Sequence, residues 1–205
     1  VNVIPGHNLT IGALGVFILW FGWFGFNGGS QLAIGGEGNA VAVSSIFLNT
    51  NLAAAAGGMA AMTITWIRHK KPGLSLSLNG ALAGLVAITA GCDIVTPVGS
   101  IIIGLIAGIV LVFSVALYDK VFRVDDPVGA ISVHGINGAL GTILVGFFAV
   151  DGGIFYGDGA SLLISQLIGV AAVAVWALGL GFALFLGLKY TIGLRVTPRE
   201  EHLGL

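Results

Sequence analysis

The residue best suited to chemistry in this sequence is His134, which lies inside a long run of apolar and very small residues. The stretch RVDDPVGAISVHGINGALGTILVGFF is long enough to cross a membrane and contains this one histidine. One ring nitrogen of a histidine can donate a proton while the other accepts one, so the ring suits a proton relay. Ionisable groups at membrane depth mark substrate paths, relays or cofactor sites. We therefore favour a functional role over the alternative, a neutral histidine with one interhelical hydrogen bond.

The same stretch predicts where His134 lies along its helix. Asp126 followed by Pro127 is typical of a helix N-cap with proline at the first helical position. At about 1.5 Å per residue, His134 then lies roughly 12 Å along the helix, near the middle of a hydrocarbon core about 30 Å thick. Its predicted neighbours on the same face are all small: Ala130, Gly138 and Gly141. We expect open space in front of the ring, filled by a neighbouring helix or by a passage.

A second constellation lies in LWFGWFGFNGGS, near the start of the chain. Leu19, Trp23, Phe26 and Ser30 are spaced four, three and four residues apart, which predicts one helical face. An aromatic wall that ends in a hydroxyl suits a small cation, because the rings offer cation–π attraction and the oxygen accepts a hydrogen bond. An aromatic belt at the membrane interface, or simple packing, explains the pattern equally well.

The remaining ionisable residues have structural explanations. Asp125 and Asp126 favour capping and helix-dipole stabilisation at a cytoplasmic helix start over a direct role in transport. The other histidines are expected to be solvated at membrane edges or in the tail: His7, His69 and His202.

Several kinds of chemistry find no support in the sequence. A metal site needs several converging ligands, and the single cysteine, Cys92, argues against a cysteine-based zinc site. There is no GxxxxGK[ST] loop for ATP, and no Ser/His/Asp arrangement is evident. We expect no metal, no cofactor and no enzymatic activity.

The rest of the chain supplies the elements that must hold these residues. Of the 205 residues, 57% are hydrophobic and 8% are charged, against about 25% charged residues in soluble domains. A transmembrane helix needs about 20 mostly apolar residues, and six segments qualify. They are Leu9–Phe26, Ala40–Ile67, Leu74–Val95, Val98–Tyr118, Val128–Val150 and Ala160–Ile192. The runs lack the alternation of barrel strands, so we predict an all-α integral membrane protein with six transmembrane helices, the last one tilted or partly outside the bilayer.

The charged residues predict an orientation. All eight Lys and Arg lie after the second or fourth segment or at or after the end of the sixth, while the other breaks contain acidic residues. By the positive-inside rule, both ends of this chain lie in the cytoplasm, at a plasma or inner membrane. The basic residues are too few and too dispersed for a phosphate-binding stripe, so we expect no nucleic-acid partner.

Glycine is the most informative small residue, with 34 copies, many within the predicted spans. Small residues let membrane helices approach closely. The glycines therefore predict a tightly packed bundle and give no indication of an activity.

Several stretches together resemble the ammonium transporter (Amt/Rh) family. They are HNLTIGALGVFILWFGWFGFNGGS, NTNLAAAAGG, AGLVAITAGCDIVTP and RVDDPVGAISVHGINGALGTILVGFFA, and the closing TIGLRVTPREEHLGL resembles the start of the family's cytoplasmic tail. The resemblance covers essentially the whole chain in consistent order. The combination of WFGFN…GS with DDP…HG…G is closer to the Amt branch than to the Rh branch.

This resemblance implies an architecture. Such proteins have eleven transmembrane helices, in two inverted five-helix repeats plus a last long, tilted helix, and they form homotrimers with one pore per subunit. This chain matches helices six to eleven, with residues 1–192 as the transmembrane half and residues 193–205 as the start of the tail. The first half of the pattern is missing, so we expect it in a longer form of the same protein or in a separate chain. We expect no complete pore from these 205 residues alone.

The resemblance also implies a role for each candidate residue. His134 matches the second member of a twin-histidine pair at the pore centre, and Trp23 matches a tryptophan that lines the pore near that pair. Phe26 matches one of two stacked phenylalanines that gate the external vestibule, and Ser30 matches the hydroxyl of the external recruitment site. Further positions along the pore are matched by Leu19, Leu82 and Thr89.

The implied function is the transport of ammonium or ammonia across a membrane. The cation would bind at the outer aromatic and hydroxyl site and lose a proton, and neutral ammonia would then pass a histidine-lined pore. Potassium cannot release a proton, so this scheme discriminates against it. Expected partners are ammonium or ammonia, membrane lipid and, at the tail, a PII-type signalling protein.

Three alternatives stay open. An Rh-type channel would pass neutral ammonia gas. An ammonium sensor would couple the same module to a signalling partner. A redox subunit would bind haem through His134, although bis-histidine ligation needs a second histidine.

Overall fold

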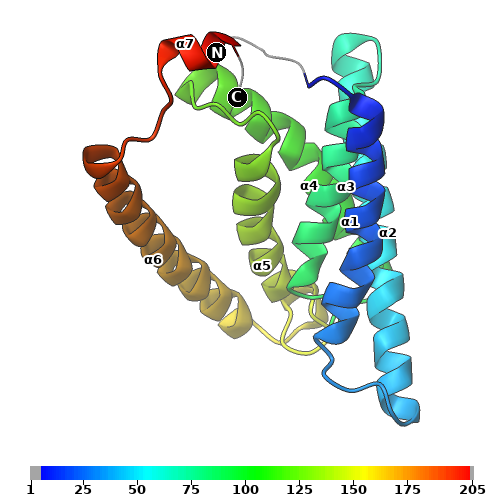
Figure 1. The fold of residues 1–205 in the computed structure, drawn as a ribbon. Helices are drawn as coiled ribbons and strands as arrows, with labels where there is room; N and C mark the ends of the chain where they lie inside the picture. The colour runs from blue at the N-terminus through cyan, green and yellow to red at the C-terminus, as the bar shows by residue number, and fades with distance from the viewer. Residues whose placement is uncertain (1–5, 204–205) are drawn as a thin grey trace. The chain divides into compact units, whose positions relative to one another are not determined.

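The computed structural model describes residues 6–203 and is built from helices (Figure 1). The longer helices are α1 (Leu9–Gly29), α2 (Glu37–His69), α3 (Leu74–Thr89), α4 (Pro97–Leu117), α5 (Asn137–Phe148) and α6 (Ser161–Thr191). The shorter ones are η1 (Tyr118–Phe122), η2 (Ile131–Ile136), η3 (Ile154–Tyr156) and α7 (Pro198–Leu203). The described residues contain no strand, only an isolated bridge between Val95 and Ala149. The prediction of an all-α protein is confirmed.

Length and composition support most of the predicted spans. Five helical segments within residues 6–203 are long and apolar enough to cross a membrane, and they contain α1, α2, α4, α5 and α6. The remaining element, α3, is apolar but has only 16 residues. At about 1.5 Å per residue it reaches about 24 Å, less than the roughly 30 Å of a typical hydrocarbon core.

The third span ends at Thr89 rather than at Val95, where the sequence predicted its end. Asn49 explains the early stop, because its side chain is 2% exposed and donates hydrogen bonds to two carbonyls of the following turn. Its Nδ2 atom lies 3.0 Å from the Cys92 oxygen and 2.9 Å from the Val95 oxygen. The Thr96 hydroxyl then caps α4. The apolar residues after Thr89 therefore form a turn held by a buried amide.

Very small residues bring α2, α3 and α4 together. Ala53 on α2 is fully buried, and its carbonyl oxygen faces both neighbouring helices. A Cβ atom at Gly84 of α3 would lie 2.2 Å from that oxygen, and one at Gly104 of α4 would lie 2.3 Å from it. No other residue type fits at these positions without movement of the backbones. The predicted packing role of glycine is confirmed at this contact.

The chain divides into two compact units, Val1–Gln166 and Leu167–Leu205. The second unit contains most of α6 and the short helix α7. Thr197 caps α7, because its N–H and hydroxyl both donate to the Glu200 carboxylate, while the Glu200 N–H donates to the Thr197 hydroxyl oxygen. These bonds lower the pKa of Glu200, the Thr197 hydroxyl contributing most.

Candidate functional site

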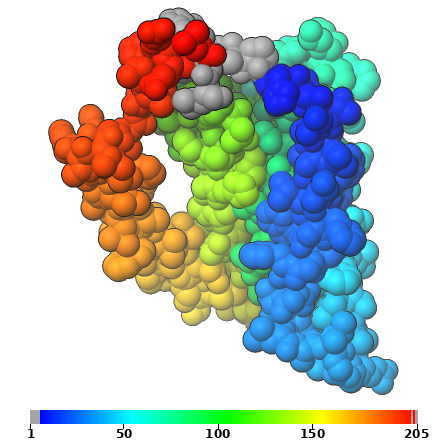
Figure 2. Space-filling model, viewed as in Figure 1, coloured from blue at the N-terminus to red at the C-terminus, as the bar shows by residue number. Residues whose placement is uncertain are grey.

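Helix α1 carries three of the seven predicted site residues, with Ser30 at its C-cap, and three side-chain contacts hold this helix in place. Asn27 donates from Nδ2 to the Thr50 hydroxyl of α2 at 3.0 Å, and both residues are buried. Phe24 meets Phe47 of α2 edge to face, with ring centroids 5.4 Å apart. The rest of α1 is largely exposed at the surface of the first unit (Figure 2). These contacts fix the rotation of α1, and with it the direction of its exposed aromatic face.

The third contact joins two predicted site residues that lie far apart in the sequence. The indole Nε1–H of Trp23 donates to the Thr89 hydroxyl of α3 at 2.8 Å. The Thr89 hydroxyl in turn donates to the Leu85 carbonyl, 2.7 Å away. The hydroxyl therefore uses its proton within α3 and accepts the indole proton. The Trp23 ring is thus tied at its nitrogen to α3.

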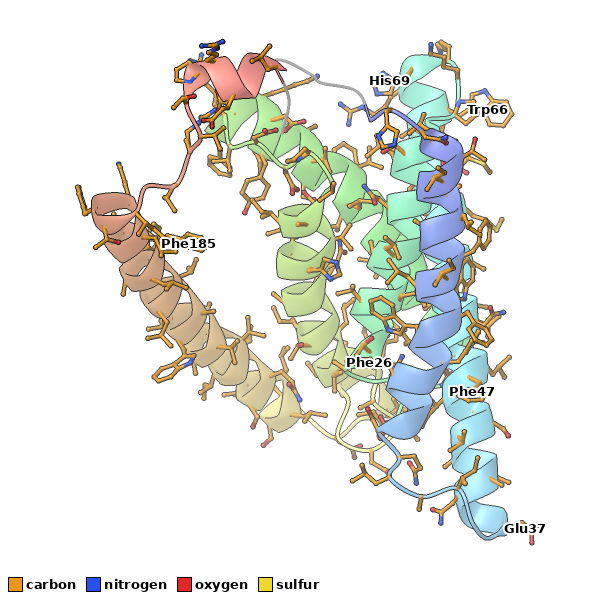
Figure 3. All side chains as sticks on the ribbon, in the orientation of Figure 1. Phe26, Glu37, Phe47, Trp66, His69 and Phe185 are labelled. Atoms are coloured by element: carbon orange, nitrogen blue, oxygen red, sulfur yellow. The ribbon has the colours of Figure 1, made fainter. Side chains whose placement is uncertain are left out.

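Phe26 follows Trp23 on α1, and Ser30 is the C-cap of this helix. The Trp23 and Phe26 rings meet edge to face at a centroid distance of 6.1 Å, as their spacing predicts. Phe26 is 64% exposed and lies near the end of α1 that leads into the loop before α2 (Figure 3). The Ser30 hydroxyl donates to the Phe26 carbonyl at 2.9 Å. Because its proton is used there, the Ser30 oxygen presents lone pairs, which suit a donor such as ammonium.

The two predicted leucines lie on the helices that Trp23 and Thr89 join. Leu19 is on α1, one turn before Trp23, and is 52% exposed. Leu82 is on α3 and is partly buried against the core. Both present aliphatic groups and offer no hydrogen bond to a passing molecule.

His134 is the fourth residue of η2, and its side chain is exposed. Within residues 6–203 the ring takes part in no hydrogen bond and no ion pair. The two residues before it, Ser132 and Val133, are buried. The segment is therefore anchored on one side, while the imidazole points away from the core of the unit.

The start of the His134 helix differs from the prediction. Asp126 is a capping residue, but the helix does not begin at Pro127. A turn intervenes, closed by the Gly129 N–H on the Asp126 carbonyl at 3.0 Å, with Gly129 at φ +74°. Such a φ disfavours any residue with a Cβ atom. Because the helix begins only at Ile131, the estimate of 12 Å between its start and His134 is wrong.

The predicted small face around His134 is also wrong at one position. Gly141 is buried against α3, where a Cβ atom would lie 2.2 Å from the Ala87 carbonyl oxygen. His134 is exposed, so the two do not share an open face. The wide helical turn of η2 explains the difference, because its residues do not follow the α-helical spacing assumed for the sequence.

Helix α3 is the shared support of the site. Its Thr89 hydroxyl accepts the hydrogen bond from Trp23. It also holds the turn that leads into η2, because Asn79 donates from Nδ2 to the Val128 carbonyl at 3.3 Å. No hydrogen bond or aromatic contact within the described residues joins His134 to Trp23 or Phe26. The structure thus fixes both parts of the candidate site on one helix, without direct contact between them.

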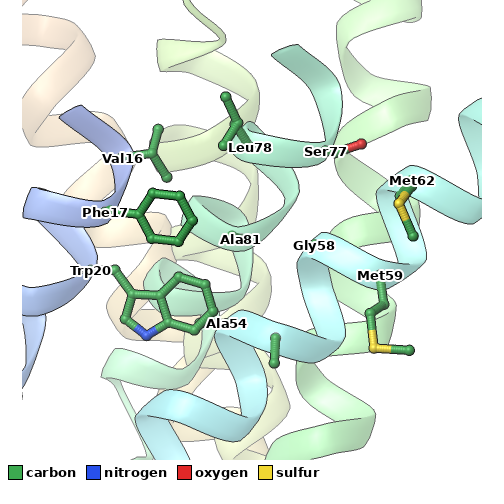
Figure 4. Close-up of a pocket in the computed structure, with 11 residues that line it drawn as sticks. Val16, Phe17, Trp20, Ala54, Gly58, Met59, Met62, Ser77, Leu78 and Ala81 are labelled. Atoms are coloured by element: carbon green, nitrogen blue, oxygen red, sulfur yellow. The ribbon is translucent and has the colours of Figure 1, made fainter. Parts of the chain in front are cut away.

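An apolar groove lies on a different side of α1 (Figure 4). Phe17 and Trp20 stack there, with ring planes 9° apart, and face Met59 of α2 and Ala81 of α3. Ser77 contributes the only hydroxyl of the lining. The groove therefore offers little to a cation and suits a lipid chain or a packed helix.

Sequence reasoning missed the buried amides that position the site. Asn27 holds α1, Asn49 ends α3, and Asn137 is fully buried at the start of α5. A signal was available, since each interrupts an apolar helical run, and a buried amide needs hydrogen-bond partners. The identity of those partners was not available, because most lie on other elements.

Comparison with known proteins identifies relatives along the whole chain. The model of the Ammonium Transporter Family matches residues 2–205. The chain is 49% identical to ammonium transporter Amt2 of Archaeoglobus fulgidus, over 100% of this chain and 45% of that protein. It is 43% identical to an ammonium transporter of Bacillus subtilis, over 97% of this chain and 50% of that protein.

Solved structures agree with these relatives. A structure described as Sensor Amt Protein matches with a TM-score of 0.87 at 41% identity, over 97% of this chain and 48% of that one. Mep2 of Candida albicans matches with a TM-score of 0.85 at 32% identity, over 96% of this chain and 45% of that one. The chain therefore spans about half the length of the relatives it matches.

Proposed function

The chain belongs to the Ammonium Transporter Family, and from this we propose that it forms the second transmembrane half of a protein that conducts ammonium or ammonia. The observation that carries the proposal is the continuous family match over residues 2–205. The chain is a multi-pass membrane protein, and its relatives are transporters rather than enzymes. The roles of individual residues below extend this family assignment.

The outer part of the path is formed by Phe26, Trp23 and Ser30. A cation over an aromatic face gains about 0.5–2 kcal/mol, more as water is excluded. The exposed Phe26 ring supplies that face, and Trp23 supports it edge to face. The Ser30 oxygen accepts a hydrogen bond from the cation, since its own proton is held by the Phe26 carbonyl.

The inner part of the path is apolar, and His134 is its proton-handling group. A charged group at membrane depth is costly, so the aliphatic side chains of Leu19 and Leu82 oppose ammonium and admit neutral ammonia. The Thr89 hydroxyl holds Trp23 beside this stretch. The exposed His134 ring accepts the proton that ammonium gives up and passes it on along the pore, so that ammonia and the proton cross separately and one positive charge crosses with each ammonia.

The rest of the protein completes this path. We assign residues 1–192 to the transmembrane half and residues 193–205 to the start of a cytoplasmic tail. The first half, in the same or another chain, faces the exposed sides of α1 and η2. Both ends of this chain lie in the cytoplasm, the assembly is a homotrimer, and the tail is available to a PII-type signalling protein. The charges of α2 support this orientation, because Glu37 lies in its first turn and Arg68 in its last turn.

The test is electrical measurement on the full-length protein in proteoliposomes. Ammonium pulses should give a current, and equal potassium pulses should give none. Phe26→Ala should raise the ammonium concentration for half-maximal current about 2- to 30-fold, which corresponds to the cation–π range above. The matched control is Phe21→Ala, on the same helix but outside this face, and it should leave that concentration unchanged. Equal currents with potassium would refute the proposal, and ammonia uptake without current would favour an Rh-type channel.

The second candidate is an ammonium-sensing module, favoured by the likeness to the structure described as Sensor Amt Protein. A sensor binds ammonium without conducting it. Saturable binding to the purified full-length protein, together with the absence of both current and uptake, would select this function over transport.

A further inference from the structure

Segment η2, which carries His134, is a π-helical turn at the entry to α5. In such a turn the backbone hydrogen bonds span five residues instead of four, and the turn is wider than an α-helix. Turns of this kind are rare, and they are frequent at functional sites. A wide turn needs side chains to hold it, since it gives up the better packing of the α-helix.

Asp126 holds the beginning of the turn. Its side chain is 6% exposed, and both of its carboxylate oxygens accept backbone hydrogen bonds. The Ile131 N–H donates to Oδ1 at 2.9 Å, and the Ser132 N–H donates to Oδ2 at 3.0 Å. These are the first two amides of η2, so the carboxylate fixes the residue at which the turn starts.

Asn137 holds the end of the turn. It is 0% exposed, and its Nδ2 atom donates to the Ser132 carbonyl at 2.8 Å, five residues back. Its backbone N–H donates to the carbonyl of His134 itself. The Asn137 side chain therefore spans the turn at the five-residue spacing, and the Asn137 backbone is bonded directly to that of His134.

The burial of the Asn137 side chain lowers the stability of the fold. Its Oδ1 atom and the neighbouring Ser132 Oγ atom are buried, and neither has a hydrogen-bond partner among the described residues. Each such atom costs roughly 1–3 kcal/mol, and an apolar residue of the same size at position 137 would remove the unpaired Oδ1 atom. The benefit of Asn137 is therefore geometric: it selects the wide turn.

We propose that Asp126 and Asn137 are positioning residues, which clamp the π-turn and so set the direction of the His134 ring. An α-helix turns about 100° per residue. Relaxation of the wide turn to α-helical spacing therefore rotates His134 relative to α5 by an angle on the order of 100°. The role of this direction in conduction rests on the proposed function, whereas the clamp itself does not.

The test compares two substitutions on one helix in the full-length protein. Asn137→Leu keeps the side-chain size and removes the donor to Ser132. The matched control is Thr142→Val, one turn further on, which removes a side-chain bond to the Gly138 carbonyl (3.0 Å) and leaves the π-turn intact. Ring signals from ¹⁵N-histidine-labelled protein report the surroundings of His134, assigned by their loss in His134→Ala.

The clamp predicts displaced or split His134 signals in Asn137→Leu and unchanged signals in Thr142→Val. It also predicts that the maximal ammonium flux falls about 10- to 100-fold in Asn137→Leu, the scale expected for an ångström-level misplacement. The ammonium concentration for half-maximal flux should stay the same, because the outer site is on α1. Asp126→Asn, which keeps one oxygen acceptor, should change the same signals and carries the test if Asn137→Leu does not fold.

The outcomes separate the clamp from the proposed function. Unchanged His134 signals in a folded Asn137→Leu protein would overturn the clamp, whatever the flux. Displaced signals with normal flux would overturn the claim that ring direction matters. A wild-type protein without flux, but with displaced signals in the variant, would support the clamp and refute the transport function.

Discussion

Gly104→Ala should destabilise the protein by forcing two helices apart. The added Cβ atom would lie 2.3 Å from the carbonyl oxygen of Ala53 and 2.9 Å from its carbonyl carbon. Ordinary contact begins at 3.4 Å, so α2 and α4 must separate by about 1.1 Å (3.4 − 2.3). Backbone atoms cannot swing aside as the end of a long side chain can, so the separation affects the whole contact between the two helices.

The expected cost follows from two opposing terms. Overpacking a close contact costs typically 1–3 kcal/mol and occasionally more. Replacing glycine with alanine inside a helix by itself raises the free energy of unfolding by up to about 1 kcal/mol. Because the clash is with backbone, we expect an overpacking cost of about 3 kcal/mol. The free energy of unfolding should therefore fall by about 2 kcal/mol in total.

The assay is the unfolding midpoint of the full-length protein in detergent, followed by the loss of its folded peak in size-exclusion chromatography. The matched control is Gly38→Ala in the first turn of α2, where a Cβ atom would meet nothing within 4 Å. The control should stay within about 0.5 kcal/mol of the wild type. A Gly104→Ala protein as stable as the wild type, or a control that loses as much, would refute the close-packing argument.

The remaining predictions concern hydrogen bonds at three places. Thr89→Val removes the acceptor of the Trp23 indole N–H and should lower the free energy of unfolding by about 1–3 kcal/mol. A double-mutant cycle with Trp23→Phe should give a coupling energy on the order of 1 kcal/mol, and no coupling would mean that the bond does not form. Asn49→Leu leaves the two carbonyls of the turn after α3 without their donor. It should lower the free energy of unfolding by about 2–3 kcal/mol in the same assay. An unchanged free energy would contradict the explanation of why α3 ends early. The Thr197 hydroxyl and backbone amide lower the pKa of Glu200, so the cap of α7 is present above the ordinary glutamate pKa and is lost as pH falls through the lowered value. Thr197→Ala should return the Glu200 titration toward its ordinary range, measured by the ¹³C shift of the carboxyl group, and an unchanged titration would rule out this cap.

Much of the fold was predictable because hydropathy determines which segments enter a membrane. The helices lie where apolar runs of sufficient length occur, and α1, α2 and α4 extend close to their predicted bounds. Helix ends were less predictable where they depend on distant residues. The apolar residues after Thr89 predict a continued helix. The chain turns there instead, because Asn49 of α2 donates hydrogen bonds to two carbonyls of that stretch.

Within the candidate site, a contact along one helix was predictable, and the contacts across helices were not. The spacing of Trp23 and Phe26 predicted their meeting, because both belong to α1. The bond between Trp23 and Thr89 spans 66 residues, and no local pattern encodes it. The small face predicted around His134 was wrong at Gly141, because an α-helical period was assumed where Asp126 and Asn137 hold a wider turn.

The most direct test of the transport account is the ion selectivity of His134→Ala in the full-length protein. Currents from ammonium and potassium pulses would be compared in the wild type, in His134→Ala and in His69→Ala, a histidine at the exposed end of α2. The account predicts that His134→Ala loses most of its ammonium current or begins to pass potassium, while His69→Ala behaves as the wild type. Unchanged ammonium current and unchanged selectivity in His134→Ala would contradict the claim that this ring handles the proton.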